Sequence, residues 1–414
     1  MALSRLVSIF GCAVMFAVAF ALSTNRKRVD KKVLVWGVLS QWGVGALLLW
    51  VPAGKFVLEK VANFVTAILS HSYVGSQFLF GALGMQGGGE SGLGVIFAFQ
   101  ILPTIVFVAA LFSILYHLGV MQLIVGVLAK VMVKTMGTSG AESLSVGAAV
   151  FMGQTEAPLT IRPFLERLTR SELFLVMVSG MATVSGAILS AYVAIGQVEK
   201  KFLLAAVAMT APACVVTAKL MMPEEEEPET SGQSEIELPK SEDSSLLLAA
   251  AQGTTDGLKL AVNVGAMLIA FIALVSLING GLGAIPFEPG GEPLSLQRLL
   301  GWLLAPVAWL MGVPWADCQA VGAVLGTRTI LNELIAFGDL RNVLDQISPR
   351  SAAIATFAVC GFANVSSIGI QIGGLGALAP GRKKDIAEMG VRALVAATLA
   401  NFSTACVAGA LMAA

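Results

Sequence analysis

Long apolar stretches alternate with short polar ones along the whole chain, a pattern typical of proteins that cross a membrane several times. A helix needs about 20 consecutive apolar residues to span the hydrocarbon core of a bilayer. Eight stretches meet this requirement, and we predict that each is a transmembrane span: 4–22, 33–52, 95–118, 172–196, 202–222, 258–283, 351–379 and 388–412.

Other segments between the spans do not fit simple membrane-crossing helices. Residues 120–136 and 296–312 are amphipathic and carry few charges, as expected for helices that lie in the membrane interface. Each is followed by a segment that is too polar and too interrupted to cross the bilayer, residues 138–169 and 315–349. We predict that these two segments are re-entrant helical hairpins.

The same order of elements occurs twice, which predicts two structural repeats. "SVGAAVFMGQTEAP" and "AVGAVLGTRTILNELIAF" both place a Val-Gly-Ala start some ten residues before a glutamate, and a span interrupted by small and hydroxyl residues follows each. The third and sixth spans run in opposite directions when the spans are counted, so the repeats are inverted. Inverted repeats with interrupted helices are typical of secondary transporters, whose binding site lies near the membrane midplane.

Composition supports a membrane protein and excludes several classes of function. Of the 414 residues, 56% are hydrophobic and 13% are charged, and the mean hydropathy is +0.83. The net charge of zero offers no basic surface for a nucleic-acid polymer. Two histidines and five scattered cysteines do not suggest a metal site, and the spans carry no nucleophile with a nearby base. We therefore do not expect an enzyme.

The loops predict the orientation of the chain and its division into parts. Residues 25–32 and 381–392 are rich in lysine and arginine and should be cytoplasmic, which makes both termini periplasmic. The acidic, proline- and serine-rich residues 223–245 fit a solvated linker that buries nothing. The predicted parts are an N-terminal region, a first repeat, a cytoplasmic linker and a second repeat: 1–94, 95–222, 223–256 and 257–414.

Two glutamates at the predicted hairpin tips are the first candidates for a binding site. An ionisable residue inside the bilayer is costly unless it faces a wet cavity or a partner, so Glu156 and Glu333 are functional candidates. Arg328 offers a structural alternative, because it could pair with Glu333. Pro158 should begin the returning helix of the first hairpin, where its missing amide N–H costs nothing. Hydroxyl and amide groups close to both glutamates favour a neutral polar ligand.

Long motifs in the chain resemble those of the concentrative nucleoside transporter family in its eight-span bacterial form. These motifs are "GQTEAPLTIRPF", "NVGAMLIAFIALVSLING", "GVPW", "NELIAF" and "CGFANVSSIGIQIGGLGALAP", and the resemblance extends over nearly the whole chain. It implies an all-α integral membrane protein of the bacterial inner membrane, a homotrimer in the lipid bilayer. It also implies that a mobile domain of hairpins and broken helices carries nucleosides such as uridine or adenosine by an elevator mechanism, with sodium as the coupling ion.

The resemblance also implies a role for individual residues of the site. The nucleobase would contact Gln154, Thr155 and Glu156 of the first hairpin, with Ile188 and Leu260 as apolar walls. The ribose would contact Glu333, Asn364 and Ser367, with Phe362 beside it.

The implied sodium site departs from the family pattern at one position. Its oxygen ligands would be the hydroxyl of Thr183, the carbonyls of Met152 and Val184, and an asparagine five residues before Gln154, where this chain has Ala149. Losing one neutral oxygen ligand should weaken such a site by about 1–3 kcal/mol. Three explanations stay open at this stage: weak sodium binding, coupling to protons through Glu156 or Glu333, or an engineered substitution at Ala149.

Overall fold

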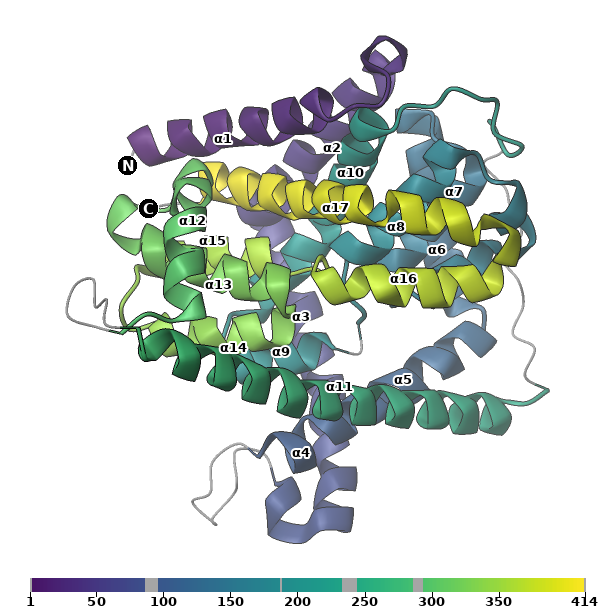
Figure 1. Ribbon diagram of the computed structural model, residues 1–414. Helices are drawn as coiled ribbons and strands as arrows, with labels where there is room; N and C mark the ends of the chain where they lie inside the picture. Colours follow the sequence, from purple (N-terminus) through teal and green to yellow (C-terminus); the bar gives the residue numbers. More distant parts are fainter. Residues whose placement is uncertain (1, 86–95, 187, 233–243, 286–292, 413–414) are drawn as a thin grey trace.

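The computed structural model describes residues 2–85, 96–186, 188–232, 244–285 and 293–412 (Figure 1). The first half of the described chain contains α1 (Ala2–Ala21), α2 (Lys31–Leu49), α3 (Pro52–Phe80), α4 (Phe97–Gln100), α5 (Leu102–His117), α6 (Val120–Met136), α7 (Gly140–Ala149), α8 (Arg170–Ala182), α9 (Leu189–Gly196) and α10 (Lys200–Met221). The second half contains α11 (Leu246–Gly283), α12 (Leu296–Leu310), α13 (Cys318–Ile330), α14 (Glu333–Val343), α15 (Pro349–Val359), α16 (Val365–Leu378) and α17 (Lys383–Leu411). Short 3-10 segments are η1 (Arg26–Arg28), η2 (Gly81–Gly84), η4 (Ala157–Arg167), η6 (Trp315–Asp317) and η7 (Pro380–Arg382). Residues 233–243 of the predicted linker and the junction at 94–95 lie outside the described residues.

The arrangement confirms the predicted all-α class with continuous spans, broken spans and hairpins. Six of the described helical stretches are long and apolar enough to cross a membrane. Each of the other two predicted spans consists of two shorter helices, α8 with α9 and α15 with α16, because the chain leaves the helical conformation between them. The predicted interfacial helices correspond to α6 and α12, and each packs on the first helix of the hairpin that follows it, α7 or α13.

Three local features differ from the predictions. Helix α3 begins at Pro52, is 29 residues long and was not predicted. Its charged residues interrupt the apolar sequence, so it contains no long uninterrupted apolar run near its start. Helix α11 begins at Leu246, well before residue 258, with the hydroxyl of Ser245 accepting from the Leu248 N–H at 3.2 Å. The returning limb of the first hairpin is the 3-10 segment η4 rather than an α-helix, with Pro158 in its first turn and Pro163 inside it.

The two hairpins enter the molecule from opposite ends, as inverted repeats require. The base of the first hairpin lies at the end with the two basic loops, where Arg170 forms an ion pair with Glu388 at 3.3 Å and Arg392 donates to the Leu22 carbonyl at 3.2 Å. The base of the second hairpin lies at the end with both chain termini, where Arg350 donates to the Met412 carbonyl at 3.1 Å. Figure 1 shows the N- and C-termini close together at this end.

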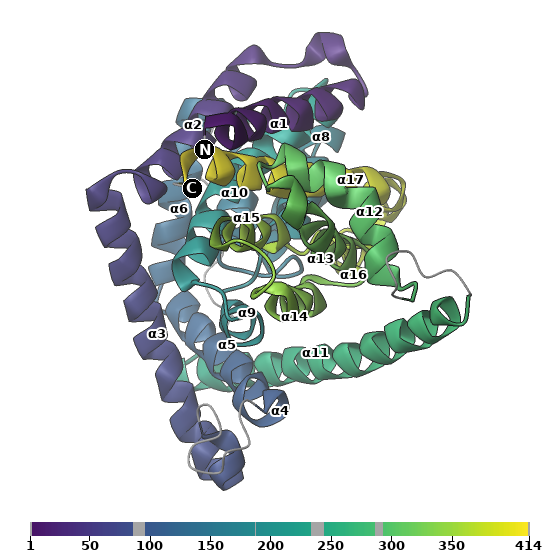
Figure 2. The ribbon, with the colours of Figure 1, turned by 90° about the vertical axis from the view of Figure 1, so that its left-hand side faces the viewer.

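Helices α5 and α11, the third and sixth predicted spans, pack against each other (Figure 2). They approach closely because glycines of α11 face α5: a Cβ on Gly253 would lie 2.5 Å from the Ser113 Cβ, and one on Gly257 would lie 2.8 Å from the Val106 Cα. Ile105, Val108 and Ala261 of this pair form a small hydrophobic cluster of their own. Further along α11, Val264 belongs to the large core of the hairpins and broken spans, and Val275 clusters with Leu331 and Ile335 of the second hairpin. The fold thus contains a compact body beside a helical pair.

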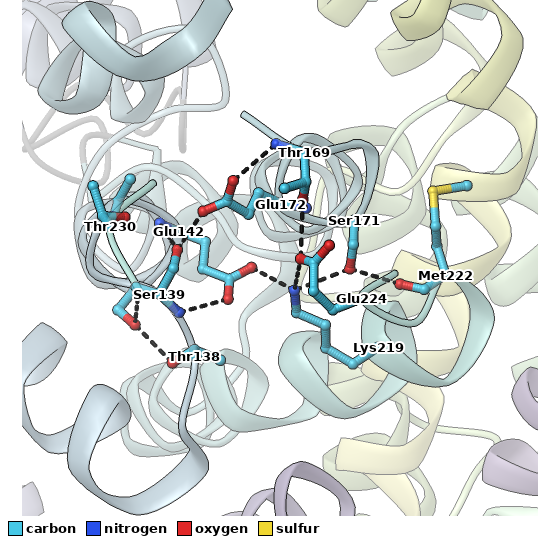
Figure 3. Close-up of polar contacts among 12 residues, drawn as sticks. Thr138, Ser139, Glu142, Thr169, Ser171, Glu172, Lys219, Met222, Glu224 and Thr230 are labelled. Carbon is cyan, nitrogen blue, oxygen red and sulfur yellow. Dashed lines mark hydrogen bonds and ion pairs between the residues drawn. The ribbon is translucent and has the colours of Figure 1, made fainter. Parts of the chain in front are cut away.

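The described start of the acidic linker is docked on the first hairpin, so the expectation that it buries nothing is wrong for residues 223–232. Thr230 is only 2% exposed, and its hydroxyl and carbonyl oxygens accept from the backbone N–H groups of Ala141 and Gly140, both at 3.0 Å. In Figure 3, the Glu224 carboxylate accepts from the Thr169 hydroxyl at 2.9 Å. The linker therefore supplies acceptors for the N-terminal amides of α7 that would otherwise have no partner.

Candidate functional site

The two broken spans meet at their interruptions, where helix ends leave carbonyl groups without helical partners. The Phe362 N–H donates to the Thr183 carbonyl at 3.3 Å and joins one break to the other. Asn401 of α17 donates through its amide to the carbonyls of Ala182 (2.8 Å) and Cys360 (3.2 Å). A Cβ on Gly361 would lie 2.5 Å from the Ala182 carbonyl oxygen, so only glycine permits this approach.

Arg328 is a fully buried residue of the second hairpin that holds this junction in place. Its guanidinium donates to the side-chain oxygen of Asn401 and to the Thr398 hydroxyl, the latter at 3.5 Å. These hydrogen bonds go to α17 rather than to Glu333. The hydrogen-bonding capacity of the Glu333 carboxylate is therefore not used by Arg328.

The tip of the first hairpin is the loop between α7 and η4. The Gly153 N–H donates to the Glu156 carboxylate at 3.1 Å, which closes a tight turn around Gln154 and Thr155. Gln154 is 8% exposed, whereas Thr155 and Glu156 are exposed side chains. Thr155 is also next to α16, since a Cβ on Gly374 would lie 2.8 Å from its methyl carbon.

The tip of the second hairpin places Glu333 in the first turn of α14. The Asn332 side chain accepts from the Ile335 N–H at 2.9 Å and caps the helix. Glu333 is 3% exposed, and its carboxylate accepts from the amide of Asn364 at 3.2 Å. Asn364 in turn caps α16, with its side-chain oxygen accepting from the Ser367 N–H at 3.0 Å.

A chain of hydrogen bonds joins the two tips through the second broken span. The Gln154 amide donates to the Ser367 hydroxyl at 3.3 Å, and Ser367 and Asn364 lie in contact at the start of α16. The structure thus brings together four residues that the sequence proposed as ligand contacts, Gln154, Ser367, Asn364 and Glu333, across 213 positions of sequence. They contribute amide, hydroxyl and carboxylate groups to one locus.

The apolar candidates border this locus. Ile188 is buried at the end of the first break, and Phe362 is half-buried within the second. Leu260 of α11 is partly buried and packs against both the main core and the small α5–α11 cluster. Leu260 therefore lies at the boundary between the compact body and the helical pair.

The residues of the implied sodium site also lie close together in the fold. Ala149 is the fully buried last residue of α7, and Thr183 and Val184 begin the first break. The Gly186 N–H donates to the Phe151 carbonyl at 3.0 Å, which ties the break to the hairpin tip next to Met152. The Thr183 hydroxyl donates to the Ser179 carbonyl at 2.7 Å and keeps its lone pairs available. Among the described residues, histidines, cysteines and acidic residues form no metal-binding group, so a cation here would rely on neutral oxygens.

Sequence reasoning missed two polar residues of the site. Asn401, fully buried in α17, holds the two breaks together. Gln371, 1% exposed in α16, donates to the Gln154 side chain at 3.2 Å. An amide in an apolar span is a detectable signal in both cases, but Gln154 and Ala182, which these amides contact, are more than 200 positions away in sequence.

Comparisons with known proteins identify the class of protein to which this fold and site belong. Three family models match the chain: "Na+ dependent nucleoside transporter N-terminus" over residues 10–83, "Nucleoside recognition" over 98–198, and "Na+ dependent nucleoside transporter C-terminus" over 202–409. The chain is 39% identical to the nucleoside permease NupC of Helicobacter pylori, covering 99% of this chain and 98% of that protein. It is 37% identical to human sodium/nucleoside cotransporter 1, covering 98% of this chain and 63% of that protein.

Solved structures give the same result. The chain is similar to CNTnw in an inward-facing substrate-bound state, with a TM-score of 0.93, 40% identity and 99% of each chain covered. A variant of that protein in an outward-facing state gives a TM-score of 0.91 at 39% identity, covering 98% of this chain and 97% of that chain. The protein belongs to the concentrative nucleoside transporter family. It is a multi-pass membrane transporter of the elevator-type fold and not an enzyme.

Proposed function

We propose that the chain imports nucleosides across the bacterial inner membrane together with a cation, sodium, and that it works as a homotrimer with both termini in the periplasm. Support for the substrate comes from the hydrogen-bonded chain of Gln154, Ser367, Asn364 and Glu333, which connects both hairpin tips. The name of the H. pylori relative adds to this support.

In this proposal each hairpin contacts a different part of the nucleoside. The base lies against Gln154, Thr155 and Glu156, between Ile188 and Leu260. The ribose lies against Glu333, Asn364 and Ser367, beside Phe362. A carboxylate accepts two hydrogen bonds, which suits the two adjacent hydroxyls of a ribose.

The proposed mechanism is an elevator in which the compact body moves against the α5–α11 pair. The small cluster of Ile105, Val108 and Ala261, with Leu260 packed between it and the main core, supports this division. One sodium ion per nucleoside would gain about 2.3 kcal/mol from 100 mV of membrane potential. A tenfold sodium gradient would add about 1.4 kcal/mol. Together these permit accumulation of several hundredfold.

Sodium would bind where the C-terminal end of α7 meets the first break, near the Thr183 hydroxyl and the carbonyls of Met152 and Val184. The negative end of the α7 dipole favours a cation here. Ala149 contributes no oxygen, so we propose that sodium binds weakly and that its coupling to nucleoside transport is loose.

Uridine uptake into liposomes, with and without a sodium gradient, tests this proposal on the wild type, Ala149→Asn and Ala149→Val. The asparagine adds an oxygen ligand worth about 1–3 kcal/mol, so the sodium concentration for half-maximal uptake should fall about 5- to 150-fold. The valine adds bulk without oxygen and should not increase the sodium response. Equal sodium dependence in the wild type and Ala149→Asn would contradict the proposed role of this position.

A proton-coupled carrier that uses Glu156 or Glu333 is the alternative, and the missing oxygen at Ala149 is the observation that favours it. Uptake that does not depend on sodium but is driven by an imposed pH gradient would support the proton-coupled carrier. Absence of uptake for uridine, adenosine and inosine under every gradient would reject nucleoside transport itself.

A further inference from the structure

Gln371 is a buried amide with an unusual position in the apolar helix α16. Its side-chain nitrogen donates to the Gln154 side-chain oxygen at 3.2 Å, and its own oxygen has no hydrogen-bond partner within the described part of the chain. A buried polar atom without a partner costs about 1–3 kcal/mol of stability. An apolar residue would avoid this cost in such a helix, so the amide of Gln371 needs a reason to be there.

The surrounding backbone makes room for this pair of amides. A Cβ on Gly180 of α8 would lie 2.7 Å from the Gln371 side-chain nitrogen and 3.1 Å from the Gln154 Cβ. The absence of a side chain at Gly180 thus allows the tip of the first hairpin, α8 and α16 to come into contact. Both amides are buried there, with 8% of Gln154 and 1% of Gln371 exposed.

The hydrogen-bond partners determine which way the Gln154 amide faces. The Ser367 hydroxyl has a single proton, and the acceptors for it are the Phe362 carbonyl and, at 3.3 Å, the Asn364 side-chain oxygen. Toward Gln154 it can therefore only accept, which turns the Gln154 NH2 group toward Ser367. The Gln154 oxygen then faces Gln371, whose NH2 group donates to it.

We propose that Gln371 is a positioning residue that fixes the Gln154 side chain as a hydrogen-bond donor toward the nucleobase. The inference rests on the proposed function, in which Gln154 contacts the base. With its oxygen turned toward Gln371 and one N–H used by Ser367, the unused donor of the Gln154 amide nitrogen is its second N–H. The site should then favour bases with a carbonyl acceptor over bases with an amino group at the same position: uridine over cytidine, and inosine over adenosine.

Replacing Gln371 by methionine tests the proposal because methionine is similar in length and apolar. Without the donor, only the 3.3 Å hydrogen bond to Ser367 orients the Gln154 amide, so the amide turns more readily to meet either kind of base. We expect the ratio of the cytidine to the uridine dissociation constant, and of the adenosine to the inosine constant, to fall about fivefold toward unity. This corresponds to one neutral hydrogen bond of about 1 kcal/mol. Ile370→Leu, at an exposed neighbouring position of α16, is the matched control and should keep both ratios.

A double-mutant cycle shows whether Gln371 acts through Gln154. In a Gln154→Ala background, Gln371→Met should leave both ratios unchanged. Gln371→Leu repeats the measurement if the methionine variant does not fold. The inference is overturned if Gln371→Met weakens all four nucleosides by the same factor, or if it changes the ratios equally with and without Gln154. A wild-type protein that binds none of the four nucleosides would instead reject the proposed function.

Discussion

Glu333 is the buried acidic residue of the described site, with 3% of its surface exposed. Its carboxylate accepts a hydrogen bond from the Asn364 amide at 3.2 Å. If its carboxylate receives the ribose hydroxyls, Glu333→Gln removes the charge and keeps the shape. Hydrogen bonds to charged groups contribute about 1.5–3 kcal/mol, so uridine should bind about 10- to 150-fold more weakly. Titration of the purified protein with uridine measures this change.

Two comparisons make the Glu333 test specific. A 2′,3′-dideoxyuridine probe lacks both hydroxyls, so its already weak binding should change little in Glu333→Gln. Glu388→Gln removes an exposed carboxylate that pairs with Arg170 at 3.3 Å and should leave uridine binding intact. Equal losses for uridine and the dideoxy probe would show that Glu333 does not contact the ribose.

At the residue scale, the sequence predicted the polar residues of both hairpin tips because a carboxylate in an apolar chain needs a reason to be there. It did not predict their partners. Gln371 and Asn401 contact groups more than 200 positions away, and such contacts follow from tertiary packing rather than from a local pattern. The pairing of Arg328 with Asn401 instead of Glu333 could not be read from their spacing for the same reason.

At the element scale, the N-terminal ends of α7 and α8 are held by one buried lysine. Figure 3 shows Lys219 of α10 between the carboxylates of Glu142 (2.7 Å) and Glu224 (3.4 Å), with a hydrogen bond to the Ser171 hydroxyl at 3.0 Å. Glu142 and Glu172 each complete a capping box, with Ser139 and with Thr169. The lysine thus neutralises the carboxylate that caps α7 and donates to a hydroxyl in the first turn of α8.

Removing this charge should destabilise the fold, because Lys219→Met leaves the buried Glu142 carboxylate without its counter-ion. Breaking a buried pair on one side costs about 3–5 kcal/mol. We expect the melting temperature, followed by size-exclusion chromatography of heated samples, to fall by at least about 5 °C.

The matched control is Lys201→Met, which removes a half-exposed lysine paired with Glu199 at 2.5 Å and should shift the melting temperature little. Adding Glu142→Gln to Lys219→Met should raise the melting temperature part of the way back to that of the wild type. An unchanged melting temperature in Lys219→Met would show that the acidic groups do not depend on the lysine.

The helical elements were more predictable from the sequence than the contacts between residues. A span, an interfacial helix and an interrupted span each have a distinct apolar pattern. The exceptions follow from what such a pattern leaves out. Helix α3 contains Lys55, Glu59 and Lys60, and these charges interrupt the apolar run by which a span is recognised. The docking of Thr230 depends on amides of α7 that only the folded hairpin presents.

At the scale of the whole molecule, the arrangement of ends predicts which groups share a side of the membrane. Asn25 of the first basic loop donates to Glu225 of the linker at 2.8 Å, and Arg5 near the N-terminus donates to the Met412 carbonyl at 3.1 Å. The basic loops and the described linker start therefore lie at one end, and both termini lie at the other. The positive-inside rule then assigns the basic end to the cytoplasm.

Single cysteines labelled with a membrane-impermeant maleimide test this orientation. Leu3 is 74% exposed, so Leu3→Cys should react in intact spheroplasts, whereas the exposed Glu226→Cys should react only after permeabilisation. The five native cysteines are all buried, so the wild type is a low-background control in both conditions. Labelling of Glu226→Cys in intact spheroplasts would place the linker in the periplasm. It would also reverse the side from which the first hairpin enters the membrane, because Thr230 attaches that hairpin to the linker.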